Sequence, residues 1–314
     1  MSKKRSYKQF DYWKKFQPFF AKKNQLTKDN LPSEEYISLK GMRVHLDRYL
    51  STSKEVRPFK VMVVHGGGAN GRLMSPIALE LQRNGYEVLS PDLPSFGLTS
   101  YNHIVSYQDW IDTLCYIIDK EYEKDKVAFV LFGMSLGGML TYQVACISNH
   151  IKGLIVTTLA DTTRFEIQQL LAKNDLLAKQ GATITKKFSL LFDPMKVPIK
   201  NLTSMDKMAN NADFVRLLQR DKVGSGSWVY LKWIRTLQST KAKIPPEKFD
   251  KCSLLFLHPE KDALLTFDAS KPFYDRLACK KEMHYLTNCG HIPLEEPGIT
   301  EFENYFLTFL NELK

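Results

Sequence analysis

Hydrophobic residues recur along the chain in short runs, each closed by turn-forming residues. Six such runs stand out, the last one weaker than the others: 59–64, 87–89, 127–132, 154–158, 254–257 and 282–286. Longer stretches with helical spacing lie between them, at 76–84, 107–120 and 136–148. Buried strands that alternate with helices are typical of βαβ units. The pattern therefore predicts an α/β fold with a mostly parallel sheet that carries helices on both faces.

The alternation stops between residues 162 and 249. Leu, Met, Phe and Trp at helical spacing predict helices there, at 163–179, 201–220 and 227–239. A segment of this length is too long for a loop, so we expect a small helical domain inserted between two strands. This organisation predicts an N-terminal extension of 1–34, a core formed by 35–161 with 250–314, and a helical insertion of 162–249.

The segment before the first buried run has two parts. Residues 35–39 and 42–50 look like strands joined at Lys40-Gly41, which predicts a hairpin. In the extension, Phe10, Trp13 and Phe16 recur every three residues, which suits one face of a short helix that Pro18 limits. Two interpretations stay open. The extension contacts a membrane surface through residues 1–30, or it packs its aromatic side chains on the main domain.

Composition narrows the class of protein. The 314 residues are 44% hydrophobic and 25% charged, as in ordinary globular proteins. Most of the net charge of +10 lies in residues 1–30, which hold nine Lys or Arg and two Asp, so the rest is nearly neutral. We therefore expect no nucleic-acid surface, which needs basic residues along a whole face. No apolar run reaches the roughly 18 residues of a membrane-spanning helix.

The five cysteines are odd in number, with no CxxC pair and no Cys/His cluster. This favours free thiols in a reducing compartment and argues against a zinc site. The basic N-terminus lacks the apolar core of a secretory signal, so we expect a cytoplasmic location.

The strongest motif is Gly-Met-Ser-Leu-Gly at 133–137, directly after one predicted strand and directly before a helix. In that setting G-x-S-x-G is a nucleophile elbow, a tight turn that exposes a serine beside a helix N-terminus. Serine needs a base to accept its proton, and histidine is the usual one. Ser135 is therefore the predicted nucleophile.

The base and the acid should follow the nucleophile in the order Ser, acid, His. Among the seven histidines, His291 lies on a loop just beyond the last predicted strand, where a base is expected. Asp262 follows the strand at 254–257 and is the preferred acid, which would orient the imidazole. Glu260 and Asp161 remain alternatives for that role.

A third element is His-Gly-Gly-Gly at 65–68, again directly after a buried strand. Acyl transfer creates an oxyanion that needs preorganised N–H donors, and glycines permit the close backbone approach. We assign the donors as the backbone N–H groups of Gly67 and Leu136, with Gly66 or Gly68 as alternatives. The phosphate-binding patterns G-x-x-x-x-G-K-[ST] and G-x-G-x-x-G are absent from this position.

Together these motifs resemble the alpha/beta-hydrolase superfamily over about 35–161 and 250–314. The loop 90–100, Ser-Pro-Asp-Leu-Pro-Ser-Phe-Gly-Leu-Thr-Ser, is similar to the family's D-x-P-G-x-G-x-S loop, with Ser95 where glycine is usual. Within the superfamily the pattern looks most like the lysophospholipase, monoacylglycerol lipase and serine aminopeptidase group. The insertion of 162–249 resembles the cap, or lid, that many members carry over the active site.

The resemblance implies a serine hydrolase that cleaves acyl esters of small molecules, in one interpretation lipid-derived, through a Ser135–His291–Asp262 triad without metal or cofactor. Apolar cap residues would line the way in: Phe188, Leu191, Phe192, Trp228, Tyr230 and Trp233. An amidase or aminopeptidase with the same triad is the first alternative. A small-molecule binding protein on a hydrolase fold is the second. The sequence predicts no oligomeric state.

Overall fold

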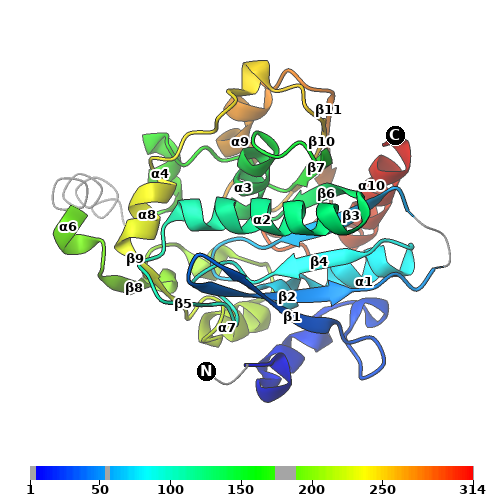
Figure 1. The fold of residues 1–314 in the computed structure, drawn as a ribbon, viewed down its shortest axis with the longest axis horizontal. Helices are drawn as coiled ribbons and strands as arrows, with labels where there is room; N and C mark the ends of the chain where they lie inside the picture. The colour runs from blue at the N-terminus through cyan, green and yellow to red at the C-terminus, as the bar shows by residue number, and fades with distance from the viewer. Residues whose placement is uncertain (1–4, 54–56, 174–188, 314) are drawn as a thin grey trace.

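The computed structural model describes residues 5–53, 57–173 and 189–313. A nine-stranded sheet runs through the molecule in the order β1-β2-β4-β3-β6-β7-β10-β11, and the short β5 pairs with β2 (Figure 1). Neighbours pair in parallel along β4-β3-β6-β7-β10-β11. By contrast, β2 runs antiparallel to β1, β4 and β5. The predicted parallel α/β sheet is therefore confirmed.

The strand positions follow the apolar runs closely. The strands of the large sheet are β1 (Ser33–Leu39), β2 (Met42–Tyr49), β3 (Phe59–Val64), β4 (Val88–Pro91), β5 (Ser100–Tyr101), β6 (Ala128–Gly133), β7 (Ile151–Val156), β10 (Ser253–Pro259) and β11 (Lys281–Leu286). The predicted hairpin is also present, because Lys40 and Gly41 both take positive φ, 44° and 77°, between β1 and β2. Such a pair of left-handed residues matches the twist of two antiparallel strands.

Helices cover both faces of the sheet. The α-helices are α1 (Ser75–Arg83), α2 (Tyr107–Asp125), α3 (Leu136–Ala145), α4 (Phe165–Leu171), α6 (Ser189–Phe192), α7 (Ala212–Arg220), α8 (Leu231–Leu237), α9 (Phe267–Tyr274) and α10 (Gly298–Glu312). Short 3₁₀ helices are η1 (Tyr7–Gln9), η2 (Asp11–Phe19), η3 (Lys22–Asn24), η4 (Gly71–Met74), η6 (Ile199–Asn201), η7 (Met205–Lys207) and η8 (Pro246–Lys248).

Alternate residues of the central strands feed two separate hydrophobic cores. In β6, Phe129 and Leu131 point into the core beneath α2 and α3, while Val130 and Phe132 point into the core beneath α1 and α10. This follows from the period of two in a strand, which sends successive side chains to opposite faces. Both faces are therefore buried, as the near-continuous apolar runs predicted.

The N-terminal extension packs on the main domain. η2 is a 3₁₀ helix, in which residues three apart stand one above the other. The spacing of three between the aromatic residues therefore places Trp13 and Phe16 on one face. Trp13 and Phe16 are buried, and Phe16 contacts Phe214 of α7 edge to face at 5.3 Å between ring centroids. Figure 1 shows the extension in dark blue beside α7. The extension thus touches both the core and the inserted segment.

The sequence predicted a purely helical inserted segment, but the structure shows that it also contains strands. Strands β8 (Lys196–Pro198) and β9 (Trp228–Tyr230) pair as a small antiparallel sheet, so the helix predicted at 227–239 begins only at Leu231. Only part of the helix predicted at 163–179 can be compared, as α4, because 174–188 lie outside the described residues. Elements α4, α6, β8, β9 and α8 of the segment gather on the left of Figure 1.

Candidate active site

Ser135 lies in the turn between β6 and α3, at φ 55° and ψ −126°. A positive φ is costly for a residue with a Cβ, so this backbone is strained. Tight packing around the turn explains its glycines: a Cβ on Gly133 would lie 2.3 Å from the carbonyl oxygen of Gly137. The Ser135 amide donates to the Thr157 hydroxyl, 3.0 Å away at the end of β7. These contacts hold the serine at the carboxyl end of the parallel strands.

His291 and Asp262 meet Ser135 in one chain of hydrogen bonds. The Nδ1 of His291 lies 2.7 Å from Oδ2 of Asp262, and its Nε2 lies 2.8 Å from Oγ of Ser135. Because an ionised carboxylate only accepts, Nδ1 carries the proton and Nε2 is left to accept from the serine hydroxyl. All three side chains are buried, with 7% of Ser135 exposed. The structure therefore brings together the three residues predicted as nucleophile, base and acid.

Asp262 is held in its charged form. Burial by itself would raise its pKa, but the hydrogen bond and charge of His291 and two backbone amides outweigh this and lower the pKa. Those amides, of Leu264 and Leu265, each donate to Oδ1 at 2.9 Å. A fixed, ionised carboxylate can orient the imidazole and stabilise its protonated form.

The alternative acids bond elsewhere. Glu260 is exposed and accepts from the backbone amide of Asn288 at 2.9 Å. Asp161 accepts from the amide and hydroxyl of Thr163, at 3.0 and 2.7 Å. Neither carboxylate has a bond to His291 among the residues that the structure describes.

The glycine loop after β3 packs against the elbow. A Cβ on Gly66 would lie 2.9 Å from both the Met134 carbonyl oxygen and the Ser135 Cβ, so only glycine fits there. His65 is neutral, since burial lowers its pKa, and its Nε2 accepts from the Leu93 amide at 3.0 Å. Its Nδ1 then donates to the carbonyl of Gly66 at 2.7 Å. The buried histidine thus links this loop to the loop after β4.

The two assigned oxyanion donors lie beside the nucleophile. Gly67 and Leu136 line one cavity with Ser135. Among the described residues, neither of their backbone amides donates to a main-chain carbonyl in a turn, loop or cap. Leu136 is the first residue of α3, where amides have no partner inside the helix. Freedom from such partners is what an oxyanion donor requires. Gly68, an alternative donor, has φ 82° and offers its carbonyl to the Ser225 hydroxyl at 2.9 Å.

A cavity of about 410 Å³ opens onto Ser135 beneath the inserted segment. Its wall is mostly apolar and includes Leu171, Met195, Val197, Ile199, Leu202, Met208, Trp233, Leu237 and Leu264. Of the six apolar residues expected at its opening, Phe192 and Trp233 line it. Leu191 and Trp228 are instead 74% and 55% exposed, Tyr230 is half-buried, and Phe188 lies outside the described residues.

A buried ionic network beside the glycine loop was not predicted from the sequence. Asp92 accepts from the amides of Gly71 and Leu98, both at 2.7 Å, and pairs with His45 Nδ1 at 2.9 Å. Arg72 forms a two-pronged ion pair with Asp47. Each residue type is common on surfaces, so only the tertiary structure reveals that these charges are buried together.

Two further searches concern cofactors and membranes. Among the described residues, no group of three or more His, Cys, Asp or Glu side chains is arranged to hold a metal ion. None of the helices in the described ranges combines the length and apolar character that crossing a bilayer requires.

Comparison with known proteins matches the chain to one family. The family model described as serine aminopeptidase, S33, matches residues 58–298. A soluble variant of monoglyceride lipase from Saccharomyces cerevisiae superposes with a TM-score of 0.73 at 16% identity, covering 93% of this chain and 98% of that one. The monoacylglycerol lipase of Paleococcus ferrophilus gives 0.67 at 18% identity, covering 85% and 98%. A search of the curated proteins finds no match.

Proposed function

The chain belongs to the serine aminopeptidase S33 family of alpha/beta hydrolases, and from this premise we propose that it is a serine hydrolase of neutral acyl esters. Its substrate would place a hydrocarbon acyl chain in the cavity above Ser135. The observation that carries this proposal is the hydrogen-bonded chain Ser135–His291–Asp262 opening into an apolar cavity.

In the proposed reaction, His291 accepts the proton of Ser135 as its oxygen attacks the ester carbonyl. The backbone amides of Gly67 and Leu136 stabilise the oxyanion of the tetrahedral intermediate. His291 then protonates the leaving alcohol, and the acyl group stays on Ser135 as an ester. Water, deprotonated by His291, attacks this ester, and the acid and the free serine are released.

Charge inside the cavity favours an ester over an aminopeptide. An aminopeptidase must bind the ammonium group of its substrate, and a carboxylate is the usual partner. Among the described residues that line the cavity, none is Asp or Glu. Its one charged side chain, Arg235, is already paired with Asp193, with Nε donating at 2.9 Å. An uncharged substrate therefore fits this wall better than a cationic one.

We further propose that residues 162–249 act as a cap. Most of the apolar wall comes from this segment, while Ser135, Gly67 and Leu264 come from the core. The Ser225 hydroxyl bonds the Gly68 carbonyl, which fixes the segment to the glycine loop. Acyl-chain preference would then be set by the cap, not by the sheet.

The nucleophile is tested by fluorophosphonate labelling of the wild type beside Ser135→Ala. We expect label on the wild type alone. Equal labelling of both proteins would show that another residue is the nucleophile. Failure to label a folded wild type that still binds esters would favour the binding-protein alternative.

The substrate class is tested by kcat/KM for p-nitrophenyl esters of increasing acyl length beside aminoacyl p-nitroanilides. Each CH₂ group buried contributes about 0.8 kcal/mol, or about a factor of four, until the cavity is full. We expect kcat/KM to rise with chain length and the anilides to react poorly. Faster turnover of the anilides would establish the aminopeptidase instead.

For residues 1–30, any membrane contact would be electrostatic, because Tyr7, Trp13 and Phe16 are buried while Lys8 and Lys14 are exposed. Sedimentation with vesicles tests this. Contact should require anionic lipid and disappear at high salt. Binding to vesicles of neutral lipid would contradict it.

A further inference from the structure

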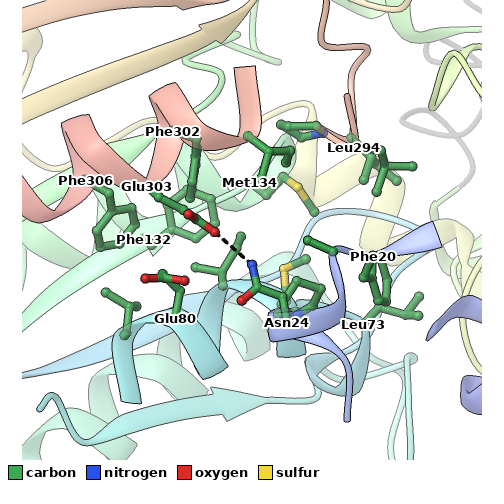
Figure 2. A pocket seen from close by; sticks show the side chains of 18 of the residues that line it. Phe20, Asn24, Leu73, Glu80, Phe132, Met134, Leu294, Phe302, Glu303 and Phe306 are labelled. Carbon is green, nitrogen blue, oxygen red and sulfur yellow. Dashed lines mark hydrogen bonds between the residues drawn. The ribbon is translucent and has the colours of Figure 1, made fainter. Parts of the chain in front are cut away.

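A second cavity lies away from the proposed acyl cavity, between the N-terminal extension, α1 and α10 (Figure 2). Its volume is about 250 Å³. It shares no lining residue with the cavity above Ser135. Met74, Phe132 and Phe306 in its wall belong to the core beneath α1 and α10. Ile199, Trp233 and other residues of the acyl cavity belong to the opposite core. The two cavities are therefore separate spaces, although Phe20 and Leu73 of the second cavity also belong to the core of the acyl cavity.

The wall of this second cavity is mostly hydrocarbon. Figure 2 shows Phe302 and Phe306 of α10 with Phe132 and Met134 on one side, and Phe20 of the extension opposite. An engineered apolar cavity of roughly 150 Å³ stays free of water and binds benzene. A larger apolar space of natural origin is therefore suited to a hydrocarbon ligand.

The carboxylates of the lining select against an acidic ligand. Three carboxylates, Glu80, Glu296 and Glu303, line the cavity, and the described lining holds no lysine or arginine. With Lys23 and Arg83 paired to two of them, the three carboxylates leave one net negative charge, which disfavours a fatty carboxylate or a phosphate.

Each of these carboxylates is already bonded within the protein. Glu303 accepts from the Asn24 amide at 2.8 Å and pairs with Lys23. Glu80 pairs with Arg83, and Glu296 accepts from the Thr300 hydroxyl at 2.9 Å. Because Lys23 and Arg83 balance two of the three charges, the carboxylates would attract a cationic ligand only weakly. A neutral head group remains the best fit.

We propose that this cavity binds the hydrocarbon chain of a neutral single-chain lipid, such as a glycerol monoester or monoether, with its uncharged head beside Glu80 and Glu303. The binding does not require hydrolysis and so stands apart from the proposed function. Met134 and Ile292 both line the cavity, and they are the chain neighbours of Ser135 and His291. An occupant therefore contacts both loops that carry the proposed nucleophile and base.

The test is calorimetric titration of the full chain with 1-O-dodecylglycerol, an ether that no esterase cleaves, below its micelle concentration. Ser135→Ala serves as background. We expect two equivalents to bind, one in each cavity. In that background, Ala21→Trp should remove one equivalent, because Ala21 lines the second cavity and the indole would fill it. Lys22→Trp is the matched control, since Lys22 is exposed and outside the lining, and it should keep both.

Ala172→Trp fills the acyl cavity and should remove the equivalent bound there. The equivalent in the second cavity should remain. With the acyl cavity blocked in this way, dodecanoate should bind at least tenfold more weakly than the ether. Ile77→Trp is a second way to fill the new cavity if Ala21→Trp does not fold.

Retention of the full stoichiometry by folded Ala21→Trp and Ile77→Trp would overturn the proposal. So would a single equivalent that Ala172→Trp abolishes, or dodecanoate binding as tightly as the ether. A wild-type dimer that Ala21→Trp converts to a monomer would also overturn it, because the cavity would then be covered by a second copy. A single equivalent removed by Ala21→Trp alone would support this site and count against the acyl cavity.

Discussion

The Tyr7 hydroxyl lies 3.1 and 3.0 Å from the two oxygens of Asp92, a carboxylate that is fully buried and 85 positions away in the chain. Asp92 also accepts from the Leu98 amide in its own loop after β4 and from the Gly71 amide at the start of η4. The N-terminal extension therefore helps to stabilise the loop that adjoins the glycine-rich turn. It is part of the folded domain and not an appended tail.

Replacing this hydroxyl should destabilise the whole fold. Tyr7→Phe removes the donor and leaves buried carboxylate oxygens with fewer partners, which costs about 1–3 kcal/mol. The free energy of unfolding in urea measures this. Tyr36→Phe is the control, because the Tyr36 hydroxyl donates to the carbonyl of the exposed Arg5 and its loss should cost less. Equal effects would mean that the Tyr7–Asp92 contact contributes little.

The network around Asp92 also predicts a pH dependence of stability. Burial by itself would lower the pKa of His45, but Asp92, Glu34 and Asp47 outweigh it and raise the pKa from 6.5 to about 10. A raised pKa means that protonated His45 stabilises the folded state fully below pH 6.5 and loses this effect as the pH rises towards 10. Urea unfolding at pH 6.5, 8 and 9.5 should show falling stability.

His45→Gln should be less stable at pH 6.5 and should show a smaller loss of stability as the pH rises. The same pH dependence in both proteins would assign it to other groups.

Glu34 acts at the acidic end of the pH scale. Burial by itself would raise its pKa, but His45, the Tyr7 amide and Arg72 outweigh this and lower it to about 2. Its contribution is present above pH 4.5 and is lost as the pH falls towards 2.

The glycines of the turn at 65–68 should differ in what they tolerate. Gly66→Ala puts a methyl group against the Met134 carbonyl and the Ser135 Cβ, so the backbone must move. We expect a loss of about 1–3 kcal/mol in stability and slower fluorophosphonate labelling of Ser135. Gly67→Ala meets only the end of the Leu136 side chain, at 3.1 Å, which can rotate away. Its stability should stay close to that of the wild type. The reverse order would show that the turn differs from this geometry.

The sequence predicted the parallel sheet because its strands are buried on both faces and so appear as apolar runs. It also pointed to Ser135, His291 and Asp262, because each follows a strand that ends at the same edge of the sheet. These predictions needed only local pattern and chain order. The structure brings the three side chains within hydrogen-bonding distance of one another.

The cap and the cavities could not be predicted in the same way. Strands β8 and β9 are three residues each, too short to show an alternating pattern. Leu191 and Trp233 are both large and apolar, yet one is 74% exposed and the other 1%. Which of them lines a cavity depends on packing between distant segments. The buried ionic network likewise draws its members from the extension, the hairpin and two loops.

The identity of the acid is the sharpest remaining test of the site. Asp262→Asn keeps the shape of the side chain but removes the negative charge that orients and stabilises protonated His291. We expect kcat on a short p-nitrophenyl ester to fall by at least about 10³-fold, with the fold retained by circular dichroism. Glu260→Gln and Asp161→Asn are matched controls, since neither carboxylate bonds His291 in the described chain, and each should stay within about threefold of the wild type. A large loss of kcat in either control, with Asp262→Asn still active, would identify that control residue as the acid. For Asp161 the acid would then follow a different strand, β7.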